Sequence, residues 1–405
     1  MVFDPGSGAP SNAHQNHPAR AHIWFLAVIT FSGTLAMHIF VPALPIVAVD
    51  FDASAGLVQL TLSSYIAGLA LGQLVYGPIS DRFGRRPVLV AGMIVYALAS
   101  LAALCAPTIH TLIIARLFQA LGGCSGLVLG RAIVRDNASD NDVAKNLSLM
   151  NLMVVIGPGL SPLVGSALVE TAGWRSIFVA LFGLGVLSLL LILRLLPESR
   201  SSDDNGMRTV LRNYAGLLKS PRFLGLTIGG GCATTSFYAF IGAAPFIFVD
   251  QLNRPMSEVG FYLALNIAGV WFGSLTANRM VGRVAAGRLM VIGSILSCTG
   301  AAIFLFSASS GSLDLPFTLL PVLLLAYGAG IASPTALAEA LSVNPLAAGS
   351  ASGLYGFAQM SIGAVCASLV SIGGNPALAA GTVMFVAGIL AQLSFWMAQR
   401  AVFKR

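Results

Sequence analysis

Charged residues are scarce in this sequence. Asp, Glu, Lys and Arg make up only 9% of the 405 residues, whereas roughly a quarter of the residues of a soluble domain are charged. Hydrophobic residues account for 56%, and the mean hydropathy is +0.85. A chain with so few charges cannot cover itself with a hydrated surface. The composition therefore excludes a soluble domain and predicts a protein that lies in lipid.

Motifs of several function classes are also absent. No Gly-x-x-x-x-Gly-Lys-Ser/Thr run is present, so the sequence shows no P-loop for ATP. The five cysteines lie singly in or beside apolar stretches and are predicted to be packing residues, with no metal or cofactor site. The net charge of +7 is spread along the chain, which predicts no nucleic-acid partner. No His-x-x-x-Asp or Glu-x-x-His array supports a membrane enzyme.

Long apolar stretches are what the sequence has in abundance. A helix needs about 20 apolar residues to cross the hydrocarbon core of a bilayer. Twelve stretches meet this requirement: 22–44, 56–76, 88–106, 110–132, 147–169, 176–196, 223–249, 258–280, 289–308, 316–340, 347–372 and 377–400. The sequence therefore predicts an all-α membrane protein with twelve transmembrane helices.

Lys and Arg are unevenly distributed over the junctions between these stretches. With the N-terminus in the cytoplasm, the basic junction residues fall on one side, and only Arg175 and Arg254 remain on the other. Because cytoplasmic loops carry an excess of Lys and Arg, we expect both termini in the cytoplasm and a location in a bacterial inner membrane. Residues 1–21 lack the basic start of a cleavable signal and are predicted to be a disordered cytoplasmic tail.

The longest polar interval, 197–221, separates six predicted spans from six. We expect it to be a flexible cytoplasmic linker between an N-terminal bundle, 22–196, and a C-terminal bundle, 222–405. The run 278–283 repeats the run 81–85 with one insertion, at the same place in the second half. This repeat predicts two pseudo-symmetric six-helix bundles.

The run Gly77-Pro78-Ile79-Ser80-Asp81-Arg82-Phe83-Gly84-Arg85-Arg86 joins the second and third predicted spans. Four ionised side chains and two helix-breaking residues cannot lie in lipid, so we expect a tight polar turn. The pattern Gly-x-x-x-Asp-Arg-x-Gly-Arg-Arg resembles the loop between helices two and three of the major facilitator superfamily, which carries small solutes across membranes. The resemblance implies a cytoplasmic gate formed by Gly77, Asp81, Arg82, Gly84, Arg85 and Arg86. Glu339, in the tenth span, either caps this gate or is a solvated helix end.

Arg116 lies inside the fourth predicted span, where a charged side chain is costly unless it faces a partner or water. The run Arg116-Leu117-Phe118-Gln119, followed by Gly122 and Gly123, resembles the fourth-helix motif of the same superfamily, in which the Arg is linked to proton coupling. Gln119 lies one turn away on the same helix face, which favours a functional pair. The alternative is an arginine whose head reaches the outer interface.

Two further segments resemble the antiporters of this superfamily. The run from Gly157 through Pro158 and Pro162 to Gly165 is similar to their fifth-helix motif, and its prolines are expected to bend the helix at a packing hinge. The run from His38 to Pro45 resembles the first helix of drug:proton antiporters of the bicyclomycin and chloramphenicol resistance type. Many relatives of that type have an aspartate at the position of His38.

His38 and Arg116 are expected at matching depth, on the order of 10 Å below the outer surface. We hypothesise that they form a switchable positive site for a proton or an anionic group of the substrate. A neutral His38 that is hydrogen-bonded to a neighbouring helix is the alternative. The substrate cavity is expected to include the following mid-span side chains: Tyr65, Gln73, Asn151, Phe237, Tyr238, Asn266, Trp271, Tyr327, Tyr355 and Gln359.

The resemblance implies a secondary transporter that works by alternating access. We expect a monomeric exporter of small amphipathic, drug-like compounds, driven by protons and needing no cofactor. The alternative is a proton-coupled or facilitative transporter of a small metabolite, such as a sugar, an amino acid or an organic anion. A membrane-embedded enzyme is less favoured. The expected partners are the small-molecule substrate, protons and the lipid bilayer.

Overall fold

The computed structural model describes residues 23–137, 157–197 and 206–400. The first half contains α1 (Ile23–His38), the 3-10 turn η1 (Val41–Ala43), α2 (Leu44–Asp50), α3 (Ala55–Phe83), α4 (Arg85–Leu104), α5 (Ile109–Asn137), a helix over 157–172 and α7 (Arg175–Leu195). The second half contains α8 (Gly206–Leu218), α9 (Pro221–Thr235), α10 (Phe237–Phe246), the π turn η2 (Ile247–Gln251), α11 (Met256–Met280), α12 (Ala286–Ser309), α13 (Leu315–Ser342), the 3-10 turn η3 (Pro345–Ala347), α14 (Ala348–Val370) and α15 (Pro376–Arg400).

Eleven helical segments in the described part of the chain are long and apolar enough to cross a membrane. They coincide with eleven of the twelve predicted spans. For example, the observed segment Met256–Met280 corresponds to the predicted span 258–280, and Pro376–Arg400 corresponds to 377–400. The fifth predicted span, 147–169, lies partly outside the described residues, and the helix over 157–172 occupies the rest of it. The spacing of apolar runs therefore predicts the membrane helices closely.

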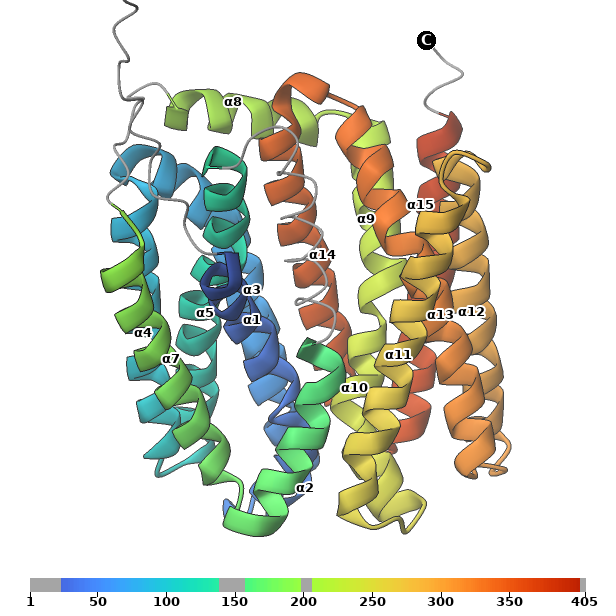
Figure 1. The fold of residues 1–405 in the computed structure, drawn as a ribbon. Coiled ribbons are helices and arrows are strands. Elements are labelled where there is room, and N and C mark those ends of the chain that lie inside the picture. The colour runs from blue at the N-terminus through green and yellow to red at the C-terminus, as the bar shows by residue number, and fades with distance from the viewer. Residues whose placement is uncertain (1–22, 138–156, 198–205, 401–405) are drawn as a thin grey trace, which may run out of the picture.

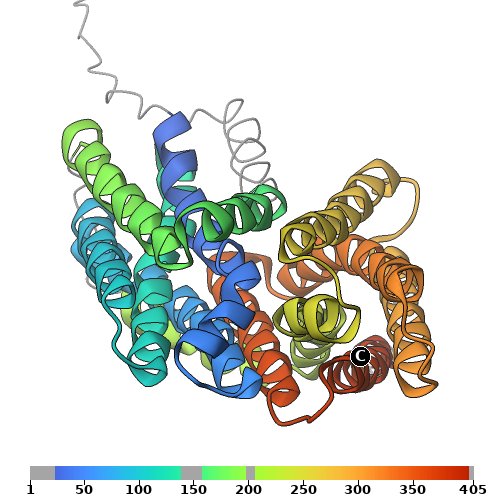
Figure 2. The ribbon, with the colours of Figure 1, turned by 90° about the horizontal axis from the view of Figure 1, so that it is seen from below.

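The helices form two groups that stand side by side (Figure 1). Helices α1 to α7 form one group and α9 to α15 the other, while α8 lies across one end (Figures 1 and 2). We call this end the α8 end and the opposite one, where α2 lies, the α2 end. Within the first group α5 packs against α1, α3 and α4, and within the second α13 packs against α9, α11 and α12.

Among the described residues, the contacts between the two groups include the following. Helix α3 packs along α14, and α10 contacts η1 and α2 at the α2 end. The helix over 157–172 approaches α11 closely: a Cβ on Gly260 would lie 2.6 Å from the Pro162 carbonyl oxygen, and one on Gly159 would lie 3.8 Å from Ile267. The hinge segment predicted from its prolines therefore lies at the boundary between the two groups.

The predicted polar turn at 77–86 is wrong in its extent. Helix α3 continues through Gly77 and Pro78 to Phe83, and the chain turns only at Gly84, whose φ is +91°. A proline inside a helix removes one backbone hydrogen bond without ending the helix when neighbouring groups satisfy the freed carbonyl. Glycine reaches a positive φ without steric cost, so the return of the chain depends on Gly84 alone.

The predicted first span, 22–44, and the linker also differ from expectation. The first span is longer, reaches Asp50, and is broken between His38 and Leu44, where Pro42 opens the 3-10 turn η1. The interval 197–221 is not a flexible linker throughout, because 206–218 forms α8. Its residues Val210 and Leu217 give it an apolar face, which packs against α3 and α14.

Small residues set the closest helix contacts of the first group. A Cβ on Gly122 of α5 would lie 2.6 Å from the carbonyl oxygen of Gly92 on α4, and one on Gly126 would lie 2.8 Å from Cγ2 of Ile29 on α1. The glycines at 122 and 126 are therefore packing residues, as their four-residue spacing predicts.

Replacing Gly122 by alanine should lower the thermal unfolding temperature, because α4 and α5 must separate to admit the methyl group. Overpacking of this kind costs about 1–3 kcal/mol. Gly183→Ala on α7 is the matched control, since its Cβ would meet nothing within 4 Å. Unfolding in detergent, followed by intrinsic fluorescence, should show a loss for Gly122→Ala and none for Gly183→Ala. Equal unfolding temperatures would contradict this packing account.

Candidate functional site

Arg116 is fully buried in the middle of the first group of helices, with 0% of its surface exposed. Its Nη1 donates to the Ala36 carbonyl oxygen at 3.0 Å and to Gln119 Oε1 at 2.6 Å. Arg116 therefore does not reach toward an interface for solvation. The predicted pair of Arg116 and Gln119 is in direct contact.

Aromatic rings supply the rest of the surroundings of Arg116. Its Cζ lies 4.1 Å from the ring centroid of Tyr65, 4.9 Å from that of Phe40 and 6.0 Å from that of Phe178. Tyr65 is held in place by its hydroxyl, which donates to the Gly33 carbonyl at 2.7 Å. No carboxylate within the described residues pairs with the guanidinium, so ring faces stand where an acid would be expected.

The break in the first span explains the contact with Ala36. Helix α1 ends at His38, so Ala36 is among its last four residues, whose carbonyls have no intrahelical N–H partner. These carbonyls also form the negative end of the helix dipole. Arg116 donates to one of them from α5. The negative end of a broken helix thus provides part of the compensation that a carboxylate would give.

Gln119 connects Arg116 to α4. Its Nε2 donates to Ser100 Oγ at 2.8 Å, and the Ser100 hydroxyl donates to the Tyr96 carbonyl at 2.7 Å. Both ends of the Gln119 amide are therefore used, which orients its oxygen toward Arg116. Ser100 could not be predicted as a member of this network, because single serines are common in apolar membrane spans.

His38 lies at the end of α1, where the two groups of helices meet. It is 6% exposed, its Nδ1 is 3.0 Å from the Thr34 carbonyl oxygen, and its ring centroid is 6.5 Å from that of Tyr238 on α10. Arg116 contacts α1 two residues earlier, at Ala36. The two side chains are thus close in depth along α1, but neither is among the contact partners of the other.

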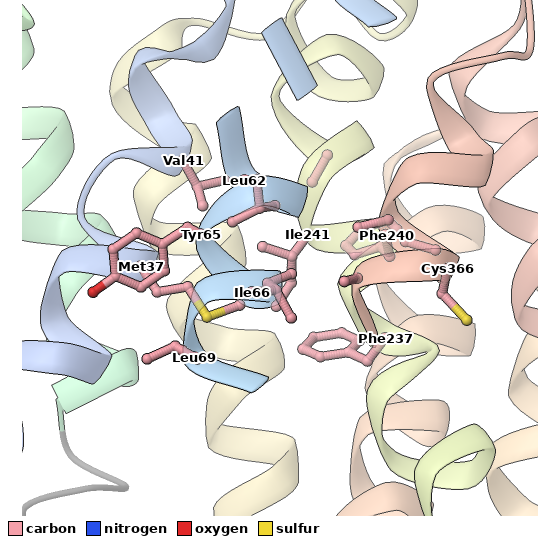
Figure 3. Packing of buried hydrophobic residues seen from close by; sticks show 14 of the residues in the cluster. Met37, Val41, Leu62, Tyr65, Ile66, Leu69, Phe237, Phe240, Ile241 and Cys366 are labelled. Carbon is pink, nitrogen blue, oxygen red and sulfur yellow. The ribbon is translucent and has the colours of Figure 1, made fainter. Parts of the chain in front are cut away.

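An apolar cluster fills the region between the first group and α10 (Figure 3). Met37 and Ile66 from the first group approach Phe237 and Ile241 of α10, and all four are buried. The Tyr65 hydroxyl points away from α10 (Figure 3). The contacts of Arg116 described above are all with the first group of helices, whereas the ring of His38 faces that of Tyr238 in the second.

Two predicted cavity residues of the second group bond to a neighbouring helix, and a third bonds within its own helix. Gln359 Nε2 on α14 donates to Thr234 Oγ1 on α9 at 2.8 Å. The Tyr327 hydroxyl on α13 donates to Thr276 Oγ1 on α11 at 3.1 Å. Asn266 is fully buried, and its Nδ2 donates to the Tyr262 carbonyl at 2.9 Å. Thr234 was not predicted as a site residue, although two adjacent threonines, Thr234 and Thr235, inside an apolar span could have indicated it.

The remaining predicted cavity residues are scattered. Gln73 lies at the contact between α3 and α14, where its side chain touches Gly356, and Tyr355 is buried on α14. Trp271 is 42% exposed and packs on its neighbour Phe272, with ring centroids 5.2 Å apart. Asn151 lies outside the described residues.

The predicted gate residues interact within their own groups of helices. Asp81 and Arg85 form an ion pair at 2.6 Å, Arg82 stacks on Phe83, and Arg86 Nη2 donates to the Leu193 carbonyl at 3.0 Å. Glu339 accepts from Arg222 at 3.3 Å, which joins the start of α9 to α13. Glu339 thus has an ion-pair partner within the second group, and its role as a cap of the gate stays a prediction.

The predicted hinge packs against α1. A Cβ on Gly157 would meet the ring of Phe31, and one on Gly165 would meet the Ile39 carbonyl oxygen. The Ser161 hydroxyl donates to the Gly157 carbonyl within the same helix. The glycines of this segment let the helix approach α1 on one side and α11 on the other.

Gln119→Leu should destabilise the fold by about 1–3 kcal/mol, because the buried Arg116 charge loses a partner. Ser100→Ala, which removes only the more distant hydrogen bond, should have a smaller effect. Thermal unfolding of both variants in the same detergent measures the difference. A Gln119→Leu protein as stable as the unmodified one would show that Gln119 does not compensate Arg116.

Comparison with known proteins agrees with this geometry. The family model described as Major Facilitator Superfamily matches residues 26–368. The chain is 30% identical over 379 residues to the uncharacterized MFS-type transporter YdgK of Bacillus subtilis (strain 168), covering 92% of this chain and 94% of the relative. It is 30% identical over 348 residues to multidrug resistance protein D of Escherichia coli (strain K12), covering 85% and 86%.

A bicyclomycin resistance protein homolog of Haemophilus influenzae is 27% identical over 352 residues, covering 85% of this chain and 87% of the relative. Among solved structures, a mutant of the nucleoside transporter NupG matches with a TM-score of 0.73 at 14% identity, covering 94% of this chain and 99% of that one. The xylose transporter XylE from E. coli, in a partially occluded inward open conformation, matches with a TM-score of 0.68 at 15% identity, covering 93% and 97%. The fold and the matched family model together place this chain in the major facilitator superfamily of membrane transporters.

Proposed function

We propose that this transporter exports small amphipathic, drug-like compounds in exchange for protons, by alternating access of its two six-helix bundles. The observation that carries the proposal is the buried Arg116, which lies in the first bundle and has no carboxylate partner among the described residues. A charged side chain inside a membrane span costs several kcal/mol, so its presence favours a functional role. Relatives named for multidrug or bicyclomycin resistance support export of drug-like compounds.

His38 supports proton coupling. It lies at the junction of the two bundles, facing Tyr238, and an imidazole can bind and release a proton. Rocking one bundle against the other would move α10 relative to α1 and change the access of water to His38. A movement of the end of α1 would reach both His38 and Arg116, because Arg116 donates to the Ala36 carbonyl, two residues before His38. Proton loading from one side and release to the other would follow from this change.

The orientation and location belong to the same proposal. The α8 end carries the basic junctions that include Arg82, Arg85, Arg222 and Arg288. This end would therefore face the cytoplasm of a bacterial cell, with both termini on that side. The pathway would run between the bundles from the gate residues near Gly84 to His38, and a single chain would be the working unit.

Replacing His38 by glutamine should reduce proton-driven transport and flatten its dependence on pH, because the titrating group at the bundle junction is lost. His110→Gln is the matched control, since His110 is exposed at the start of α5. The measurement is the initial transport rate in vesicles over a series of pH values. An unchanged rate and pH profile for His38→Gln would reject a role for His38 in coupling.

Everted vesicles test the direction and the drive of transport. With an imposed pH gradient and a panel of fluorescent amphiphiles, the vesicles should accumulate at least one compound, and an uncoupler should abolish the accumulation. Vesicles without the protein are the control. Transport that does not depend on the gradient would replace the proposal with facilitated diffusion, and gradient-driven loss of compound from the vesicles would replace it with import.

A further inference from the structure

Helix α8 is a surface helix that touches both bundles. It packs against α3 of the first bundle and against α14 and α9 of the second. It lies across the end of the bundles (Figure 1), at the end where the candidate spans Ala55–Phe83 and Arg175–Leu195 finish and the one from Pro221 begins. A helix in this position lies in the interfacial layer of the bilayer.

The residues of α8 divide into three stripes around the helix. At 100° per residue, Val210, Asn213, Tyr214 and Leu217 share the face that packs on the protein. Leu211 and Leu218 lie next to this face and are 58% and 51% exposed. The third stripe contains the cation Arg212, and Lys219, in the turn directly after α8, continues it; both are exposed.

The exposed leucines need an apolar environment that the described part of the chain does not supply. Two leucines one heptad apart form a continuous apolar stripe, and the cationic stripe runs alongside it. From Gly206 to Arg222 the sequence contains no Asp or Glu, while it contains Arg208, Arg212, Lys219 and Arg222. This arrangement matches a bilayer surface, where acyl chains receive the leucines and anionic headgroups receive the cations.

We propose that α8 is a binding surface for anionic phospholipid, and that lipid bound there holds the two bundles together where α3 meets α14. The occupant is the lipid of the surrounding leaflet, recognised by its negative headgroup together with its acyl chains. The proposal requires only that the bundles span a membrane and is independent of the transported compound.

Tyr214 links α8 to the contact between the bundles. Its hydroxyl donates to the Leu74 carbonyl of α3 at 3.4 Å and lies 3.3 Å from the position that a Cβ on Gly353 of α14 would take. Leu74 precedes Pro78 by four residues, so its carbonyl has no N–H partner within α3. Tyr214 thus satisfies the carbonyl that the proline frees.

Two further observations support this link. Burial, together with the negative charge of Asp81, raises the pKa of Tyr214, so its hydroxyl remains a donor at neutral pH. Asn213 Nδ2 donates to Ser350 Oγ on α14 at 3.5 Å. Because neighbouring residues of α8 contact different bundles, a shift of one bundle against the other must displace the helix.

Hydrogen–deuterium exchange in nanodiscs tests the proposal. In phosphatidylcholine mixed with phosphatidylglycerol, the amides of 206–219 should exchange on the order of tenfold more slowly than in phosphatidylcholine alone, because two cations then face an anionic surface. The double variant Arg212→Gln with Lys219→Gln should lose this difference. The matched control, Arg194→Gln with Arg288→Gln, removes two exposed cations from the same end and should keep it.

A second variant separates lipid binding from its effect on the bundles. Tyr214→Phe should retain the lipid-dependent protection of α8 and lose the lipid-dependent protection of residues 348–360 on α14. Equal exchange in the two lipid compositions, or loss of the lipid effect in the Arg194 and Arg288 control, would overturn the binding surface. A lipid effect on 348–360 that persists in Tyr214→Phe would overturn the link to the bundles.

Discussion

The interaction on which the first bundle depends is the contact between the Arg116 guanidinium and the broken end of the first span. Transferring an unpaired charge to an apolar interior is strongly unfavourable. The cost is offset here by the Ala36 carbonyl at the C-terminus of α1, by the Gln119 amide and by the face of the Tyr65 ring. These groups come from α1, α3 and α5, so one buried charge fixes the mutual positions of three helices.

The two bundles differ in the polar and charged side chains that they bury. The first bundle has a buried cation and a histidine at its boundary. The predicted cavity residues of the second bundle are uncharged, and two of them, Gln359 and Tyr327, bond to threonines on neighbouring helices. The apolar cluster around Phe237 lies between the two, so the only predicted titrating side chain that meets the second bundle is His38, among the residues that the structure describes. This asymmetry assigns the coupling chemistry of the proposed cycle to the first bundle.

The sequence predicts the membrane helices well because their apolar length is dictated by bilayer thickness. It predicts the contact between Arg116 and Gln119 because residues three apart share a helix face. The contact between Arg116 and Ala36 could not be predicted. Ala36 accepts through its backbone carbonyl, which every residue has, so no residue type marks the contact in the sequence. The contact between Tyr214 and Leu74 could not be predicted for the same reason: the Leu74 carbonyl lacks its helical N–H partner because of Pro78, and it accepts from the Tyr214 hydroxyl. The continuation of α3 to Phe83 was not predicted either.

The most direct test of the central claim compares Arg116→Met with the unmodified protein, by thermal unfolding and by proton-driven transport in proteoliposomes. Arg116→Met keeps the length of the side chain but removes the donor to the Ala36 carbonyl and to Gln119 Oε1, and a buried acceptor left without its donor costs about 1–3 kcal/mol. Arg116→Met should therefore lower the unfolding temperature and abolish gradient-driven transport. A variant that is equally stable and transports at the normal rate would contradict it.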